Sequence, residues 1–272
     1  MRDVPDLKIL ECNDCGLVTL SSLDHIQAGF YEQSGMHGAA PIPLATWLKD
    51  TDWDDQRRFD MLKPMLPNKS LLDFGCGAGG FLNKARELAG RADGVEPELR
   101  VQVYWHDRIA IYPDVESASK QGMAGGYDLI TAFHVVEHLP DPRAMIESLA
   151  NLLTRNGRIV IEVPSSEDAL LTLYDSPAFQ RFTYWSQHLF LFNAETLRRL
   201  ASQAGLRIVV IQQYQRYPLS NHLHWLSQGK PGGHQKWAFL DSPELLAAYS
   251  DALAKMGKCD TLIAHLELAE QR

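Results

Sequence analysis

The 272-residue sequence lacks the features that mark membrane and secreted proteins. No run of uncharged apolar residues approaches the roughly 20 residues that a membrane-spanning helix needs. The N-terminal residues lack the basic-then-apolar pattern of a secretory signal peptide. Only four cysteines are present, and only Cys12 and Cys15 are close in sequence, so no disulfide framework is indicated. We therefore expect a cytoplasmic protein without membrane contact.

Positive charge is also scarce. Lys and Arg total 26 against 34 Asp and Glu, which gives a formal net charge of −8. An acidic surface repels phosphate backbones, so the composition argues against a nucleic-acid partner. The length allows one large domain, or one domain with a small appendage.

Acidic residues are missing altogether from residues 196–240, where the average usage of this chain predicts about six. A local excess of positive charge in an acidic protein favours an anionic small-molecule ligand. The alternative is a solvated linker. Two tryptophans, Trp225 in this stretch and Trp185 before it, would either pack against the core or stack on a flat ligand. The candidate substrate-binding residues are Arg216, Asn221, His222 and Lys230.

The sequence does contain a regular alternation of strands and helices from residue 70 onward. Strands are predicted at 70–74, 92–95, 109–112, 127–133, 158–163, 206–213 and 259–268. Helices are predicted at 80–88, 142–153, 193–205 and 243–256. Strands that alternate with helices predict an α/β fold of the Rossmann-like, doubly wound type, with a mostly parallel sheet and helices on both faces.

Two segments do not fit this alternation. Residues 164–192 (the first cover segment) and 214–258 (the second cover segment) both follow strands. They should lie at the rim where open α/β sheets bind ligands, and we predict that they cover the substrate. Residues 1–60 are assigned to an N-terminal extension with a single CxxC, and residues 61–272 to the main domain. One CxxC supplies only two of the four ligands of a structural zinc, so we expect no zinc there.

The most informative motif is a strand, a glycine-rich turn and a helix, with the pattern D-x-G-x-G-x-G from Asp73 to Gly79. Its glycines let the backbone approach a ligand closely. They also satisfy the dinucleotide fingerprint, so an NAD-dependent oxidoreductase is an alternative, as is a glycine-rich turn without a ligand. Asp73 instead favours S-adenosylmethionine (SAM) as the ligand, because a carboxylate would repel a pyrophosphate but suits the ammonium group of SAM.

An acidic residue also ends the next predicted strand. Glu96 stands at the position where an acid accepts the ribose hydroxyls of such cofactors. The turn, this acid and the end of the fourth predicted strand together form the expected cofactor site. The predicted cofactor-binding residues are Asp73, Phe74, Gly75, Cys76, Gly77, Gly79, Glu96, Phe133 and His134.

Residues 73–79, Glu96, the strand 127–130 and the segment 136–142 (VEHLPDP) together resemble the class I SAM-dependent methyltransferases. The likeness is closest to those that act on sugars and quinone precursors, and it covers about residues 60–213. It implies a seven-stranded sheet with an antiparallel last strand, here 259–268 beside 206–213. It also implies methyl transfer to a small acceptor such as a sugar or nucleotide-sugar, with oxygen as the expected methylated atom. A non-catalytic SAM-binding protein is the alternative.

The resemblance places the segment from His134 to His138 over the methyl group. There His138 could act as a general base, because the pKa of histidine lies near neutrality. Some small-RNA and quinone-pathway O-methyltransferases carry Glu-x-x-Glu-His and a distal His that bind a divalent metal, whereas this chain has His134 in place of the first Glu. Three interpretations stay open: a metal-free base, a metal at His134, Glu137, His138 and His188, or a brace for the following helix. The predicted catalytic residues are His138, Glu137 and His188.

Overall fold

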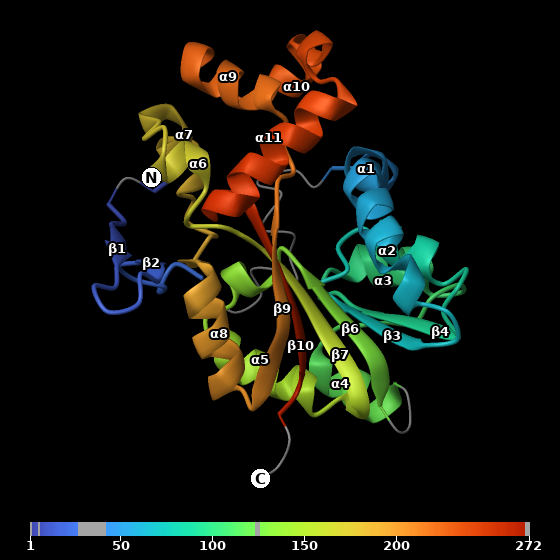
Figure 1. Ribbon diagram of the computed structural model, residues 1–272. Coiled ribbons are helices and arrows are strands. Elements are labelled where there is room, and N and C mark those ends of the chain that lie inside the picture. Colours follow the sequence, from blue (N-terminus) through green and yellow to red (C-terminus); the bar gives the residue numbers. More distant parts are fainter. Residues whose placement is uncertain (1, 5, 27–41, 123–125, 270–272) are drawn as a thin grey trace.

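The computed structural model describes residues 2–4, 6–26, 42–122 and 126–269. Its centre is a seven-stranded sheet in the order β5-β4-β3-β6-β7-β10-β9 (Figure 1). Neighbouring strands pair in parallel except β10, which runs antiparallel to both β7 and β9. The predicted fold class and the antiparallel last strand are therefore confirmed. The strands are β3 (Ser70–Phe74), β4 (Arg91–Val95), β5 (Ile111–Tyr112), β6 (Tyr127–Phe133), β7 (Leu153–Pro164), β9 (Leu206–Tyr214) and β10 (Thr261–Leu268).

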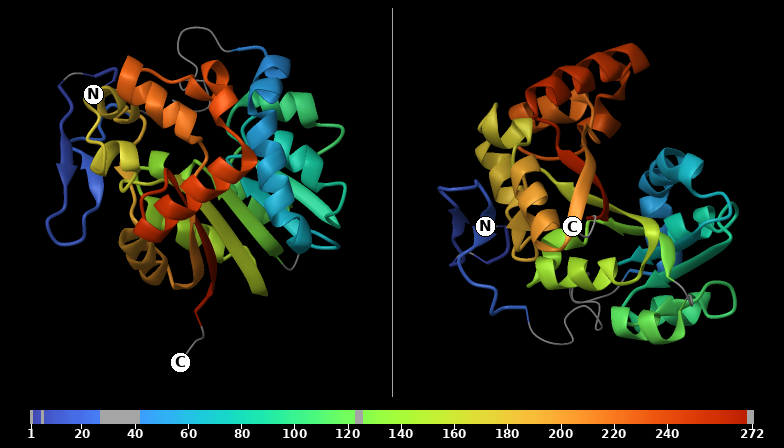
Figure 2. Two further views of the ribbon diagram at one scale, coloured as in Figure 1. Left: turned by 45° about the horizontal axis from the view of Figure 1, so that its top comes forward. Right: turned by 60° about the horizontal axis from the view of Figure 1, so that its bottom comes forward.

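Helices cover both faces of this sheet (Figures 1 and 2). One face carries α1 (Leu44–Leu62), α2 (Gly80–Ala85) and α3 (Leu99–Trp105), and the other carries α4 (Val115–Gln121), α5 (Pro142–Ala150) and α8 (Ala194–Gln203). Each interface has its own cluster of buried apolar side chains. The core is thus two layers of apolar packing, one on each side of the strands, as expected for a doubly wound fold.

Local sequence explains where several helices begin. The side chain of Asn193 accepts a hydrogen bond from Thr196 N, and the hydroxyl of Thr196 accepts one from Asn193 N, which forms a capping box at α8. At α5 the side chain of Asp141 accepts a hydrogen bond from Ala144 N, with proline at the first helical position. The predicted helix 80–88 is shorter than expected and ends at Ala85. The predicted helix 142–153 ends at Ala150 because β7 begins at Leu153.

The two cover segments form helical structure outside the sheet. The first contains α6 (Ala169–Thr172), α7 (Pro177–Thr183) and β8 (Phe190–Leu191), and β8 joins β1 (Ile9–Glu11) and β2 (Val18–Leu20) in a small sheet. The second contains α9 (Leu219–Gln228), α10 (Gly233–Lys236), η4 (Ala238–Leu240) and α11 (Pro243–Met256). These last helices stack beyond the end of the sheet where β9 stops (Figure 1).

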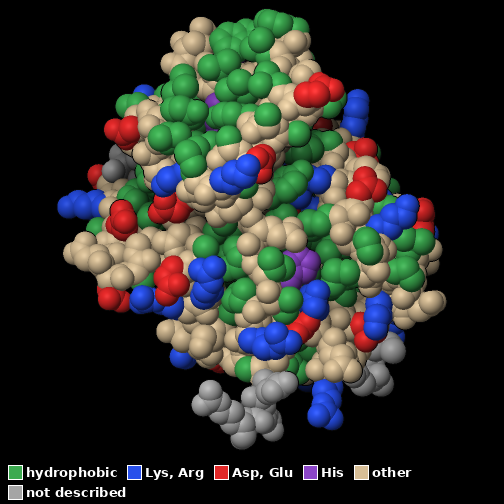
Figure 3. All heavy atoms as spheres, in the orientation of Figure 1, with side chains coloured by type: hydrophobic (Ala, Val, Ile, Leu, Met, Phe, Trp, Pro, Cys, Tyr) green, Lys and Arg blue, Asp and Glu red, His purple; other side chains and the backbone are tan. Residues whose placement is uncertain are grey.

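Helix α1 was not predicted from the sequence. It crosses the proposed boundary at residue 60, and it packs against α2 beside the glycine-rich turn (Figure 2). Residues 27–41 of the proposed extension lie outside the described residues. Within the described part of the chain, no helix combines the length and apolar character needed to span a bilayer. On the face drawn in Figure 3, Lys and Arg side chains are interspersed with Asp and Glu and form no continuous basic surface.

Candidate active site

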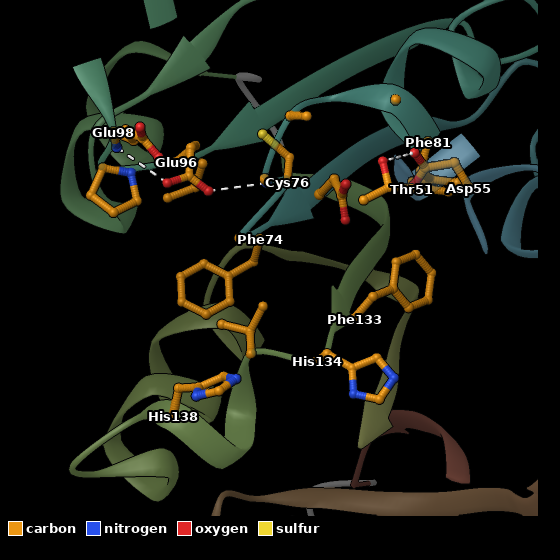
Figure 4. A pocket seen from close by; sticks show the side chains of 18 of the residues that line it. Thr51, Asp55, Phe74, Cys76, Phe81, Glu96, Glu98, Phe133, His134 and His138 are labelled. Carbon is orange, nitrogen blue, oxygen red and sulfur yellow. Dashed lines mark hydrogen bonds between the residues drawn. The ribbon is translucent and has the colours of Figure 1, made fainter. Parts of the chain in front are cut away.

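A cavity of about 580 Å³ lies at the carboxyl ends of β3, β4 and β6. Open α/β sheets bind ligands at this edge, and the volume is within the usual range for small-molecule sites. Figure 4 shows Glu96 after β4, Asp55 on α1 and His138 after β6 around the same space. Among the predicted cofactor-binding residues, all except Gly79 line this cavity. From the second cover segment, Arg216 also contributes to its wall.

Backbone conformation explains the glycines of the turn. Gly75 and Gly79 have φ angles of 70° and 83°, which fall in the left-handed region. A Cβ on Gly75 would lie 2.3 Å from a methyl carbon of Val135, and a Cβ on Gly79 would lie 2.5 Å from the indole nitrogen of Trp105. Both positions are therefore restricted to glycine by conformation and by space. Gly79 serves the packing of the turn against α3, while Gly75 faces the cavity.

Asp73 is the last residue but one of β3 and is almost fully buried. One of its carboxylate oxygens accepts a hydrogen bond of 2.7 Å from the hydroxyl of Thr131 on β6. Burial raises the pKa of Asp73 to about 7, although Thr131 and Arg58 lower it. A buried carboxyl group with a raised pKa at a cavity wall is suited to bind a cation, because the cation would restore its ionised form.

Glu96 lies directly after β4 and points into the cavity (Figure 4). Its two oxygens accept hydrogen bonds from the backbone amides of Gly77, at 3.0 Å, and Glu98, at 3.1 Å. Burial raises the pKa of Glu96 to about 7 despite these hydrogen bonds. The side chain is thus fixed against the glycine turn, with its carboxylate at the cavity wall.

The histidine cluster is partly brought together. The ligand atoms of Glu137, His138 and His188 lie within 4.8 Å of one another. The Nδ1 atoms of both histidines lie beside backbone carbonyls, at 2.6 Å from Gln187 O for His138 and 3.1 Å from Thr183 O for His188. Of the three residues, His138 lines the cavity. Burial and His138 lower the pKa of His188 to about 4, so its ring is neutral near neutral pH.

His134 belongs to a different set of contacts. Its Nδ1 lies 3.1 Å from a Glu137 oxygen, and its Nε2 lies 3.1 Å from Glu162 and 3.2 Å from Arg216. Its φ angle is 54°, an unusual backbone conformation for a residue other than glycine. The structure thus places His134 at the cavity wall between two carboxylates, and outside the group formed by Glu137, His138 and His188.

A buried ionic network joins α1 to the sheet beside this histidine, and the sequence analysis did not identify it. Glu162, on β7, has no exposed surface. It accepts hydrogen bonds from Arg57 at 2.7 and 2.9 Å and from Arg58 at 2.9 Å. Arg57 also donates to Asp54 at 2.9 Å. The network holds α1 so that Trp47, Thr51, Asp55 and Arg58 line the cavity.

The predicted substrate-binding residues are separated by the structure. Arg216 lines the cavity and forms an ion pair with Asp54 on α1. Asn221 and His222 are buried within the second cover segment, away from the cavity lining. The side-chain oxygen of Asn221 accepts hydrogen bonds from the amides of Gly232 and Gly233. Lys230 is exposed.

Sequence comparison agrees with this architecture. Residues 50–211 match the profile of a family described as a methyltransferase domain. A ubiquinone biosynthesis O-methyltransferase of Xanthomonas campestris pv. campestris is 31% identical over 116 residues, which are 40% of this chain and 48% of that protein. The chain thus spans about half the length of that curated relative.

Solved structures show the same fold at low sequence identity. A SAM-dependent methyltransferase from Archaeoglobus fulgidus aligns with a TM-score of 0.52 and 18% identity, over 78% of this chain and 91% of that one. The magnesium protoporphyrin IX methyltransferase of Synechocystis, solved with bound SAH, aligns with a TM-score of 0.50 and 13% identity, over 89% and 95%. The family match favours methyl transfer over the oxidoreductase alternative. The chain therefore belongs to the family described as a methyltransferase domain.

Proposed function

We propose that the protein transfers a methyl group from SAM to an oxygen atom of a small anionic acceptor, with His138 as the general base. One observation carries this proposal: His138 shares a cavity with Asp73 and Glu96. Its Nδ1 must be protonated to donate to the carbonyl of Gln187, so the lone pair of the neutral ring lies on Nε2. A histidine fixed in one tautomer beside a cofactor site is suited to accept a proton.

The residues of the cavity fit SAM. Asp73 would hold the ammonium group of the methionine moiety, and Glu96 would accept hydrogen bonds from the ribose hydroxyls. Gly75 brings the backbone of the glycine turn to the cavity wall, and a Cβ there would collide with Val135. When bound, SAM supplies a methyl group on a positively charged sulfur.

The chain's own residues would then orient the acceptor and remove its proton. Nε2 of His138 takes the proton of the acceptor hydroxyl as the oxygen bonds to the methyl carbon. S-adenosylhomocysteine would be the product left in the cofactor site. Because this displacement requires the oxygen, carbon and sulfur to lie in line, positioning by α1 and the second cover segment carries much of the rate.

Two arginines support an anionic acceptor. Arg58 from α1 and Arg216 from the second cover segment both line the cavity. Guanidinium groups bind carboxylates and phosphates through paired hydrogen bonds. The similarity to ubiquinone biosynthesis O-methyltransferases supports oxygen as the methylated atom. Sugars, nucleotide-sugars and related metabolites that carry an acidic group are the proposed acceptors.

The cofactor assignment is tested by replacing Asp73 with asparagine. Loss of a charged hydrogen-bonding partner costs about 1.5–3 kcal/mol, so S-adenosylhomocysteine should bind about tenfold to a hundredfold more weakly by calorimetric titration. Asp128→Asn, at the opposite end of the sheet, is the matched control and should bind normally. Equal affinities of the two variants would contradict the proposal, and detection of methylated products from a panel of anionic hydroxy compounds tests the acceptor class.

Binding of SAM should also release protons. Burial raises the pKa values of both Asp73 and Glu96 to about 7, so each carboxyl group is about half protonated at pH 7 in the free protein. An ammonium group and ribose hydroxyls favour the ionised forms, so binding should expel up to about one proton and strengthen as pH rises from 6 to 8. Titrations in two buffers of different ionisation enthalpy measure this release. A binding enthalpy independent of the buffer would contradict it.

A divalent metal is a second candidate role for the histidine cluster. Among the described residues, the second oxygen of Glu137 is buried without a hydrogen-bond partner. Glu137, His138 and His188 could hold an ion, with both Nδ1 atoms fixed by carbonyls in the manner of metal-ligating histidines. His134 is directed to Glu137 and Glu162 instead. Such an ion would act as a Lewis acid toward acceptor oxygens.

Elemental analysis separates these two roles of His138. The metal-free proposal predicts no stoichiometric ion and full activity after dialysis against a chelator. It also predicts that His188→Gln keeps most of the activity, because His188 lies outside the cavity lining. One bound ion per chain, lost together with activity in His188→Gln, would instead establish the metal site.

A further inference from the structure

Three aromatic rings lie in a row outside Arg216. Trp53, on α1, meets Tyr217 edge to face, with ring centres 6.2 Å apart. Tyr217 in turn contacts His234 of α10 at 5.6 Å. Trp53 is 48% exposed, although a large apolar side chain usually gains stability by burial. The row joins α1 to the second cover segment, the two elements that flank the cavity on this side.

The inner end of this row is positively charged. The guanidinium carbon of Arg216 lies 5.6 Å from the ring centre of Trp53 and 5.4 Å from that of Tyr217. Arg216 also lines the cavity, so the rings adjoin its wall. Among the described residues, Nε of Arg216 is buried without a hydrogen-bond partner. Lys236 adds a positive group on α10, within the stretch that contains no acidic residue.

A role for Trp53 in positioning Arg216 does not by itself explain why Trp53 is exposed. Arg216 already pairs with Asp54, and its backbone amide donates to Asp260 at 3.0 Å. The two tryptophans considered from the sequence serve elsewhere. Trp225 is buried against Phe179, and Trp185 packs near His188. Trp53 is therefore the tryptophan that combines exposure with a contact to a cavity-lining cation.

We propose that Trp53, Tyr217 and His234 form a subsite for the base of a nucleotide-linked acceptor, whose phosphates lie at Arg216. Flat bases stack on aromatic side chains, and arginine binds phosphate oxygens, so a cation next to a row of rings matches the order of groups in a nucleoside diphosphate. The proposal rests on the proposed function above and narrows its acceptor class. The part that is methylated would extend from the phosphates toward His138.

The test compares nucleoside diphosphates with inorganic pyrophosphate on protein saturated with S-adenosylhomocysteine. Saturation of the protein with S-adenosylhomocysteine is measured first, and it keeps the diphosphates and pyrophosphate out of the cofactor site. Stacking of one base contributes about 1–3 kcal/mol, which corresponds to about 5- to 150-fold in affinity. We expect at least one of the uridine, cytidine, adenosine and guanosine diphosphates to bind more tightly than pyrophosphate by this factor. Trp53→Ala should remove most of the difference and leave pyrophosphate binding unchanged.

The matched control is Phe239→Ala, which removes another exposed ring of the second cover segment, 82% exposed. It should leave every affinity unchanged. If none of the four diphosphates binds more tightly than pyrophosphate, or if Trp53→Ala leaves the ratio intact, the subsite is wrong. If Trp53→Ala weakens pyrophosphate and diphosphates equally, the rings only support Arg216, and the proposal is again overturned. Failure to bind S-adenosylhomocysteine would instead refute the cofactor site of the proposed function.

Discussion

Replacing His138 with glutamine is expected to lower kcat for methyl transfer by about 10²- to 10⁴-fold, the usual contribution of a positioned general base. Glutamine retains a group that can donate to the carbonyl of Gln187, so the fold should be preserved. Affinity for S-adenosylhomocysteine should stay the same, because Asp73, Glu96 and the glycine turn are unaltered. Single-turnover kinetics with a saturating acceptor would measure the loss directly.

A matched control is available in the second cover segment. His224 is buried and, like His138, has its Nδ1 beside a backbone carbonyl, 2.7 Å from Lys230 O. It does not line the cavity, so His224→Gln should change kcat by less than about threefold. Added imidazole should partly restore activity in His138→Ala, where space for a free base has been created. A His138→Gln enzyme as fast as the control would show that the proton leaves by another route.

The sheet and the glycine turn were predictable because their signals are local. β3 is a short apolar segment that runs directly into the turn, and Asp73 stands two positions before the first of its glycines. Neither inference requires knowledge of a distant residue. The antiparallel last strand came from the resemblance to known methyltransferases, and the register of β10 with β7 and β9 confirms it.

Helix α1 could not be predicted in the same way, because its buried residues include Asp54 and Asp55. Aspartates in a helix ordinarily indicate a solvated face. Here they are compensated by Arg57, Arg58 and Arg216, and Glu162 on β7 compensates two of these arginines in turn. A glutamate within the apolar run at the end of β7 was a signal in the sequence, since a buried carboxylate requires a partner.

Composition was a weaker guide in the second cover segment. The concentration of Asn, His, Trp and Gly favoured ligand binding at Asn221 and His222. The structure instead gives Asn221 hydrogen bonds that stabilise the turn at Gly232, and it places His222 Nδ1 2.7 Å from the hydroxyl of Tyr249. Arg216, in contrast, does line the cavity, where it pairs with Asp54, a residue 162 positions earlier in the chain. The same types of polar residue stabilise turns and bind ligands. Composition therefore cannot separate the two roles, and only the contacts in the structure distinguish them.

Glu162→Gln is expected to cost about 3–5 kcal/mol of unfolding free energy, because it leaves Arg57 and Arg58 without their buried counter-charge. The side chain keeps its volume, so packing against the neighbouring strands is little changed. Urea denaturation at pH 7 would measure the loss. Because the network fixes α1 at the cavity, acceptor binding should weaken in the fraction that stays folded.

The control for this prediction is Glu267→Gln on the adjacent strand β10. Glu267 also pairs with two arginines, Arg158 and Arg207, but its side chain is 22% exposed. Solvent screening should limit its contribution to about 1 kcal/mol or less. Equal losses for the two variants would mean that the buried network does not stabilise α1.

The effect of Glu162 should also depend on pH in a defined direction. Burial would raise the pKa of Glu162, but Arg58, His134 and Arg57 together hold it well below its ordinary value of 4.5. A carboxyl group with a lowered pKa in the folded state stabilises the protein above its unfolded pKa, and this contribution is lost as pH falls through the folded pKa. Glu162 also raises the pKa of His134, and that contribution to stability is lost as pH rises above neutrality, so the stability difference between wild type and Glu162→Gln should be largest near pH 5 and shrink below about 4.5. A difference that persists unchanged at lower pH would show that the amide disrupts packing and that charge is not the cause.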